Sequence, residues 1–176
     1  MLSDVSIRKL LAAEDPLIEP HPLDQQIQPA TVDLLLGKIA WPDLPWRRRA
    51  WRRVNWRTYD LWTIEPGDFR LASTLELVTL PADLAGWVAG KSSLARHGLT
   101  VEQAGFVDPG FLGEITLELH NVSRKPIQLW PEMPICQIAF FRLDQPADRP
   151  YGSPGLGSHY QLQLGPTPSR MAAAPR

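Results

Sequence analysis

Val107-Asp108-Pro109-Gly110-Phe111, followed closely by Glu114-Ile115-Thr116-Leu117-Glu118, is the pattern of a turn that leads into a β-strand. Asp before Pro and Gly is typical of turns, and successive side chains along a strand point to opposite faces of the sheet. The alternation puts the aliphatic residues on one face and puts Thr116, Glu118 and His120 on the other. Because glutamate is seldom buried, this strand by itself predicts a solvated Glu118 on an outer face.

The rest of the chain repeats this kind of pattern. Its 18 prolines and 12 glycines separate short alternating runs such as residues 75–80 and 126–130, which is typical of a mainly β protein. One short helix is expected over residues 5–12, where apolar residues recur at helical spacing behind Ser3 and Asp4. The length of 176 residues suits a single domain and is short for two.

A polar loop lies upstream of the strand, at Gly90-Lys91-Ser92-Ser93-Leu94-Ala95-Arg96. It offers a glycine for close backbone approach, backbone N–H groups, two hydroxyls and two cations, which together suit a polyanion. In an arbitrary protein a Ser-Ser pair is more often a helix cap or a turn. Followed by the strand that carries Glu118, however, the loop predicts the chemistry of a nucleotide site.

Charge limits the class of partner. The formal net charge is −1, so the chain has no general attraction for polyanions, and a small anion fits better than a nucleic acid. Residues 46–57 interleave tryptophans with six arginines, a composition that can hold single-stranded nucleic acid. These tryptophans recur at intervals of five, however, and do not share one face of a helix or strand. We therefore interpret this Arg/Trp segment as a surface loop or strand pair.

The single cysteine, Cys136, excludes an intrachain disulfide, and its apolar neighbours predict a buried thiol. The first residues show no basic-then-apolar signal pattern, and no apolar run approaches the roughly 20 residues that span a bilayer. A soluble cytoplasmic protein without a membrane partner is therefore expected.

Several blocks in the sequence are together characteristic of one family. In this order along nearly the whole chain, they are residues 27–34, 73–76, 90–99, 104–118, 140–143, 149–151 and 165–170. They resemble the dCTP deaminase family, whose relatives include the trimeric dUTP diphosphatases. The resemblance implies a dUTPase-like distorted β-barrel or jelly roll with a few short helices, and a homotrimer with sites between subunits.

The resemblance also nominates the site residues. It implies a hydrolase that converts dCTP to a deoxyuridine nucleotide and ammonia for dTMP synthesis, with Glu118, Ser92 and Arg96 as catalytic residues and Arg96 donated across a subunit boundary. It places nucleotide contacts at Lys91, Ser92, Ser93, Leu94, Ala95, Arg96, Asp108, Thr116, Leu117, Glu118, Gln137, Tyr151 and Gln163. Both dCTP and dUTP are expected ligands. The resemblance also suggests dTTP as an inhibitor, and the sequence leaves open whether dTTP regulates this chain.

No protein metal cluster is expected. Zinc-dependent deaminases hold their metal with His and Cys in a Pro-Cys-x-x-Cys signature, which one cysteine and four scattered histidines do not supply. A triphosphate normally arrives with Mg²⁺, which prefers phosphate oxygens and water to an all-protein cage. We therefore expect magnesium to bind through the substrate.

Gly105-Phe106, before the Val-Asp turn, resembles the bifunctional relatives that release dUMP and pyrophosphate. Three departures from the family pattern bear on this expectation. The hairpin before Asp108, which reads the base, is one residue shorter than usual; His159 replaces a Lys or Arg; and Leu162 and Leu164 replace Gly and Arg. A shorter hairpin shifts main-chain hydrogen bonds by one register step, so base specificity stays open.

We expect residues 1–165 to form one β domain and residues 166–176 a flexible tail, because the tail has almost nothing to bury. Two other functions remain open at this point. One is dUTP diphosphatase activity alone, which the shortened hairpin permits. The other is a nucleotide-binding module without catalysis, against which the combination of Glu118, Ser92 and Arg96 argues.

Overall fold

The computed structural model describes residues 1–40, 61–101 and 105–170. The Arg/Trp segment at 46–57, three residues of the base-reading hairpin and the last six residues of the tail lie outside the described residues. In chain order the elements are α1 Asp4–Leu11, β1 Ile18–Glu19, the 3₁₀ helix η1 Asp24–Gln26, β2 Thr31–Ala40, β3 Trp62–Ile64, β4 Phe69–Thr79, β5 Leu84–Gly90, α2 Ser92–Ala95, β6 Leu99–Val101, β7 Phe106–Val107, β8 Leu112–Asn121, β9 Ile127–Leu129 and β10 Pro134–Arg142.

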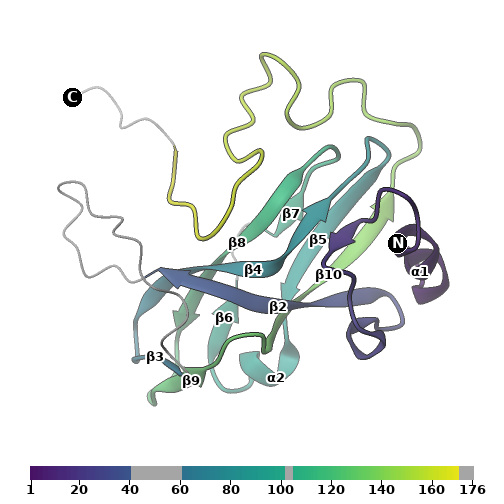
Figure 1. Cartoon of the computed structure of the whole chain (residues 1–176). Helices are drawn as coiled ribbons and strands as arrows, with labels where there is room; N and C mark the ends of the chain where they lie inside the picture. Colours follow the sequence, from purple (N-terminus) through teal and green to yellow (C-terminus); the bar gives the residue numbers. More distant parts are fainter. Residues whose placement is uncertain (41–60, 102–104, 171–176) are drawn as a thin grey trace, which may run out of the picture.

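The strands form a curled antiparallel sheet, as the sequence predicted (Figure 1). In the described part of the chain, eight strands belong to one sheet with the order β6-β8-β4-β2-β10-β5-β7, and β1 pairs with β4. The short strands β3 and β9 form a second sheet. The helix α1 lies at the N-terminus beside the strand end of β10, where the backbone N–H of Leu2 donates to Phe140 (2.8 Å). The expected mainly β architecture with short helices is confirmed.

The alternation predicted for residues 114–120 is present in β8. Leu117 and Leu119 are fully buried and Ile115 is nearly so, whereas Thr116, Glu118 and His120 are only half-buried on the opposite face. Because β8 pairs with β4 on one side and β6 on the other, its backbone position is fixed from both edges. The strand therefore holds Glu118 rigidly while leaving its carboxylate accessible.

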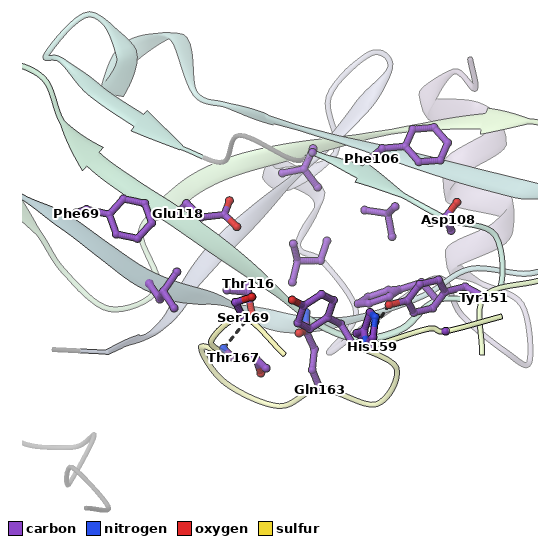
Figure 2. A pocket seen from close by; sticks show the side chains of 18 residues that line it. Phe69, Phe106, Asp108, Thr116, Glu118, Tyr151, His159, Gln163, Thr167 and Ser169 are labelled. Carbon is purple, nitrogen blue, oxygen red and sulfur yellow. Dashed lines mark hydrogen bonds between the residues drawn. The ribbon is translucent and has the colours of Figure 1, made fainter. Parts of the chain in front are cut away.

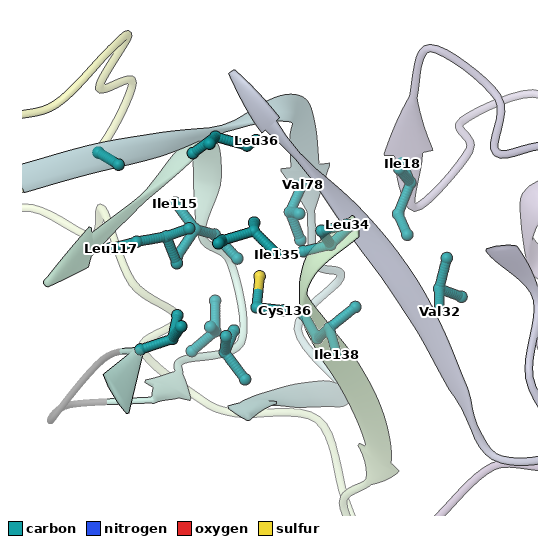
Figure 3. Close-up of a cluster of buried hydrophobic side chains, with 14 of the residues drawn as sticks. Ile18, Val32, Leu34, Leu36, Val78, Ile115, Leu117, Ile135, Cys136 and Ile138 are labelled. Carbon is teal, nitrogen blue, oxygen red and sulfur yellow. The ribbon is translucent and has the colours of Figure 1, made fainter. Parts of the chain in front are cut away.

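The core lies inside the curl of the sheet, where aliphatic side chains of β2, β4, β8 and β10 meet (Figure 3). The strand β10 contributes most continuously, because it pairs with β2 and β5 at its two edges. Cys136 is fully buried at its centre, which confirms the expected buried thiol. None of the helices in the described ranges has the length and apolar composition needed to cross a membrane.

One carboxylate lies inside this apolar layer. Glu76 is 1% exposed on β4 and accepts hydrogen bonds from the backbone N–H of Leu35 (3.2 and 3.0 Å to its two oxygens) and from Nε2 of Gln26 (3.1 Å). Burial raises the pKa of Glu76 above its ordinary value, and the hydrogen bonds from Leu35 and Gln26 offset part of that rise. The network joins η1, β2 and β4.

Replacing Glu76 with Gln is expected to make the free energy of unfolding less dependent on pH. A raised folded-state pKa means that the stability contributed by Glu76 is fully present below its unfolded pKa and is lost as pH rises through the folded pKa. The wild type should therefore lose stability relative to the variant as pH rises above the ordinary pKa of glutamate, by at most ~1.4 kcal/mol per pH unit. Urea unfolding of both proteins across this range measures the difference, and parallel pH profiles would contradict it.

Candidate active site

A cavity of about 690 Å³ opens beside β8 (Figure 2). Its floor is formed by β8 and β4, and its walls by the β7 region, the loop at 151–160 and the start of the tail. Glu118 points from β8 into this cavity, and Thr116 lies beside it on the same strand face. The volume is in the range of cofactor and nucleotide pockets.

The turn after β7 brings two more of the expected residues to the cavity. Gly110 has a positive φ of +89°, and a Cβ there would lie 2.7–2.9 Å from atoms of Pro150 and Tyr151. Glycine is therefore required both by the turn and by this close approach. The backbone N–H of Tyr151 donates to Pro109 (2.7 Å), so the turn that carries Asp108 is joined to the loop that carries Tyr151.

Two tyrosine hydroxyls stabilise the cavity wall formed by the loop at 151–160 and the tail. The Tyr151 hydroxyl accepts the backbone N–H of Tyr160 (2.9 Å), and the Tyr160 hydroxyl accepts the backbone N–H of Arg170 (3.3 Å). The Arg170 guanidinium donates to the carbonyl of His159 (2.6 Å) and lies 5.9 Å from the centre of the Tyr160 ring. These contacts tie the described end of the tail to the loop at 151–160.

Gln163 supplies a polar group inside the cavity. It is 6% exposed, and its Nε2 donates to the carbonyl of Glu114 (2.8 Å). Its Oε1 is buried and has no hydrogen-bond partner among the described residues. A buried carbonyl oxygen without a donor costs free energy, so this oxygen is suited to accept a hydrogen bond from a ligand.

The polar loop forms a separate group of residues. Lys91 precedes α2, and its Nζ pairs with Oδ2 of Asp33 (2.6 Å). Ser92, Ser93 and Arg96 are exposed on α2 and at its end. Gln137 on β10 is paired in register with Asp33 on β2, and it accepts a long hydrogen bond from the Thr31 hydroxyl (3.4 Å). Asp33 Oδ1 is buried without a partner in the described part of the chain.

The structure thus places the expected site residues in two groups, one that lines the cavity and one that does not. The cavity brings together Gly105, Phe106, Asp108, Thr116, Glu118, Tyr151 and Gln163. It is not lined by Lys91, Ser92, Ser93, Leu94, Ala95, Arg96 or Gln137. The Leu117 side chain lies in the core with 0% exposure, so a nucleotide contact at this position would come from its main chain.

Other residues that line the cavity were not among the sequence candidates. Phe69, Phe111 and Tyr160 supply aromatic surface, and Thr167 and Ser169 supply hydroxyls from the tail. Phe69 lies on β4 opposite His120 of β8, a pairing that no local pattern indicates. Thr167 and Ser169 belong to the 165–170 block. The resemblance of this block to the family indicated that the segment matters, but it did not indicate which of its side chains line the cavity.

The lining suits a nucleoside better than a bare phosphate chain. Aromatic rings and aliphatic groups can hold a base, while Glu118, Asp108 and Gln163 offer acceptors for its polar edges and its sugar. Among the described lining residues there is no Lys or Arg, and His159 is the single side chain that can carry a positive charge. A triphosphate in this cavity would therefore need cations from elsewhere.

Comparison with known proteins gives consistent results. A family model described as dCTP deaminase-like matches residues 1–143. A protein of Parafrankia sp. named "dCTP deaminase, dUMP-forming" is 47% identical over 97% of this chain and 90% of its own length. A protein of Corynebacterium glutamicum with the same name is also 47% identical, over 97% of this chain and 95% of its own.

Solved structures share the fold. A 2′-deoxycytidine 5′-triphosphate deaminase from Agrobacterium tumefaciens matches with a TM-score of 0.62 and 24% identity, over 81% of this chain and 48% of that chain, so this chain spans about half of its length. A dUTPase from phage phi11 of S. aureus matches with a TM-score of 0.51 and 13% identity, over 71% of this chain and 84% of that chain. At these identities the matches support the dUTPase-like fold.

Proposed function

The chain belongs to the dCTP deaminase-like family, and on that premise we propose that it hydrolyses dCTP to ammonia, dUMP and pyrophosphate. The observation that carries the proposal is Glu118, which points from a rigid strand into a cavity of nucleotide size. The names of the two relatives, both dUMP-forming, support the complete reaction.

In the deamination step, a water adds to C4 of cytosine and its proton passes to the Glu118 carboxylate. The proton of the new C4 hydroxyl passes to N3 and the C4–N bond to the amino group breaks, with that group leaving as ammonia after it receives a proton from Glu118, and a carbonyl remains at C4. One carboxylate acts first as base and then as acid. The half-buried position of Glu118 on β8 favours this role, because a bound base would further shield it from water.

The polar loop supplies the remaining catalytic groups from a neighbouring copy of the chain. Ser92 and Arg96 orient the water and stabilise the charge that develops at C4, and Lys91, Ser93 and the backbone of Leu94 and Ala95 hold the phosphates. These residues are absent from the lining of the cavity, which itself lacks Lys and Arg among its described residues. A homotrimer with one site at each boundary would bring both groups together.

Within the cavity, Asp108 accepts the 3′-hydroxyl of the deoxyribose, Thr116 and the main chain of Leu117 contact the base, and Tyr151 and Gln163 contact the sugar and phosphates. Gln137 contacts nucleotide from the neighbouring copy. The unpartnered Oε1 of Gln163 supports its assignment. We also extend the proposal to a domain over residues 1–165 with a closing tail at 166–176, to a cytoplasmic location, and to dTTP as an inhibitor.

Magnesium fits this site as a companion of the substrate. Among the described residues no group of three or more His, Cys, Asp or Glu side chains could hold a metal ion, which suits an ion held mainly by triphosphate oxygens. A structure of the phi11 phage dUTPase in mutant form concerns a structural Mg(II) ion. When bound, magnesium would neutralise charge on the phosphates.

The second step explains the dUMP product. A second water attacks the α-phosphorus and releases its proton to solvent, the bond from the α-phosphorus to the bridging oxygen breaks, and pyrophosphate leaves with that oxygen. Gly105 and Phe106 line the cavity beside Asp108, and the small Gly105 leaves room there for this water. Lys91 of the neighbouring copy stabilises the leaving charge.

Incubating the purified protein with dCTP and magnesium is expected to yield ammonia, dUMP and pyrophosphate in equal amounts. Enzymatic ammonia detection and chromatography of the nucleotides measure these products, and a parallel incubation with dUTP tests the second step alone. Accumulation of dUTP without pyrophosphate would show a deaminase only. Absence of ammonia together with dUMP formation from dUTP would instead show a dUTP diphosphatase.

A further inference from the structure

Residues 162–167, which lead into the tail, run alongside β8 and are hydrogen-bonded to it at successive positions. Near the beginning of the strand, the bonds are between main chains: the N–H of Leu162 donates to Leu112 (2.8 Å) and the N–H of Glu114 donates to Gln163 (3.0 Å). Two residues further, side chains of β8 replace its main chain as acceptors. The N–H of Gly165 donates to Oε2 of Glu114 (2.7 Å), and the N–H of Thr167 donates to Oγ1 of Thr116 (3.1 Å).

Glu114 is the centre of this attachment. It is 7% exposed, and its carboxylate accepts three hydrogen bonds: from Lys38 Nζ (2.8 Å) to Oε1, and from the Ser73 hydroxyl (2.7 Å) and the Gly165 N–H (2.7 Å) to Oε2. Its main chain is bonded to Gln163 in both directions. The carboxylate therefore joins β2, β4 and β8 to Gly165, the residue immediately before the tail.

The position of Gly165 decides where the tail crosses the cavity. Gly165 is buried and has a φ of +75°, a conformation that turns the chain sharply and favours glycine. Thr167 and Ser169 follow at two-residue steps, and both line the cavity that contains Glu118. Figure 2 shows Thr167 bonded to Thr116 and Ser169 close by. A shift at Gly165 would displace this wall.

We propose that Glu114 is a positioning residue that fixes the C-terminal tail over the nucleotide site through the N–H of Gly165. This inference rests on the proposed function, because it assumes that the cavity beside Glu118 binds dCTP. Glu114 lies on the same face of β8 as Thr116 and Glu118, so one strand carries the tail anchor, a ligand contact and the catalytic carboxylate. Closure of the tail and placement of Glu118 are thereby set by the same element.

Glu114→Ala is expected to raise the KM for dCTP by about 10- to 100-fold with a smaller change in kcat, because a hydrogen bond to a charged, buried acceptor is lost from the closed tail. In Glu114→Gln the amide oxygen can still accept from Gly165 and Ser73, while the partly exposed Lys38 can turn to solvent. That variant should restore KM to within about threefold of wild type. Lys38→Met is the matched control, because it removes the ion pair and keeps the Gly165 contact.

Glu114→Asp distinguishes the effect of side-chain length from the effect of the carboxylate's charge. It keeps a carboxylate for folding but withdraws it by about one C–C bond, roughly 1.5 Å, and should reproduce the raised KM of Glu114→Ala. The same changes are made in a chain that ends at residue 164. If Glu114 acts through the tail, Glu114→Asp raises KM in the full chain and has no effect in the shortened one, a non-additivity that a purely structural role would not produce.

Amide hydrogen exchange keeps the inference separate from the proposed function. Glu114→Asp should speed exchange of the Gly165 and Thr167 amides by about tenfold or more while β10 stays protected, whether or not dCTP is the substrate. Failure of the wild type to release ammonia would overturn the proposed function alone. Unchanged exchange of the Gly165 and Thr167 amides, or an equal rise of KM in full and shortened chains, would overturn the role of Glu114.

Discussion

Replacing Glu118 with Gln is expected to reduce ammonia release from dCTP by about 10²–10⁴-fold, the usual cost of removing a general acid or base. The amide keeps the size of the side chain and can still donate and accept hydrogen bonds, but it does not take a proton from water. Because β8 is held between β4 and β6, the substitution should leave the fold intact. Initial rates measured with an ammonia-coupled assay give the effect on kcat.

Binding of dCTP to the Glu118→Gln variant separates chemistry from recognition. Isothermal titration calorimetry should give a Kd within about threefold of that measured under non-turnover conditions for the wild type, since the base contacts of Thr116 and the pocket walls remain. Glu65→Gln, which changes an exposed glutamate outside the cavity, is the matched control and should retain full activity. Near-normal ammonia release by Glu118→Gln would remove this residue from the mechanism.

Arg96→Ala is expected to reduce kcat by about 10²–10³-fold, comparable to the loss of one preorganised charge-stabilising group in other enzymes. Arg96 is exposed at the end of α2, so its removal should not lower the melting temperature. The cavity has no Lys or Arg among its described lining residues, and in the proposed shared site Arg96 of a neighbouring copy supplies the missing positive charge.

Arg124→Ala provides the control for Arg96→Ala. Arg124 is also exposed but does not belong to the polar loop or to the cavity, so its loss should leave kcat and KM unchanged. Comparable losses in both variants would indicate a general effect of charge. A wild-type rate for Arg96→Ala would show that the polar loop takes no part in catalysis.

Local patterns in the sequence were sufficient for part of the fold. The alternation in β8, the helix at α1 and the buried Cys136 each follow from residues close together in the chain. The order of the strands does not, because β10 lies between β2 and β5 through pairings that connect distant segments. Such pairings depend on packing of the whole sheet.

The run at residues 75–80 shows why local alternation can mislead. Its leucines at 75 and 77 invite an inward assignment, yet Leu75 is 38% exposed while Glu76 and Val78 are buried. The pairing of β4 with β8 shifts register between Ser73 and Leu77, and such an irregularity can redirect the side chains that follow it. The groups that donate hydrogen bonds to the Glu76 carboxylate are the backbone N–H of Leu35 and the side-chain amide of Gln26. Both residues are distant in sequence, so no local pattern reveals these contacts.

The sequence predicted which residue types form the site, but it predicted only in part which of them lie together in space. Glu118, Asp108, Tyr151 and Gln163 meet in one cavity, although up to 55 residues separate Asp108 from Gln163 in sequence. Glu114 lies within the family block at residues 104–118, but its contact with Gly165 depends on the tertiary path of the chain before the tail. The polar loop lies apart from the cavity in one chain; in the proposed assembly its partner cavity belongs to another copy.

The most direct test of this account is ammonia release from dCTP by assemblies mixed from two inactive variants. Glu118→Gln and Arg96→Ala protein are unfolded together, refolded and assayed beside each variant refolded alone. If each site combines Glu118 of one copy with Arg96 of its neighbour, some sites in the mixed assemblies carry both native residues, and a substantial fraction of wild-type activity returns. A mixture that co-assembles yet stays as inactive as its components would contradict a site shared between copies.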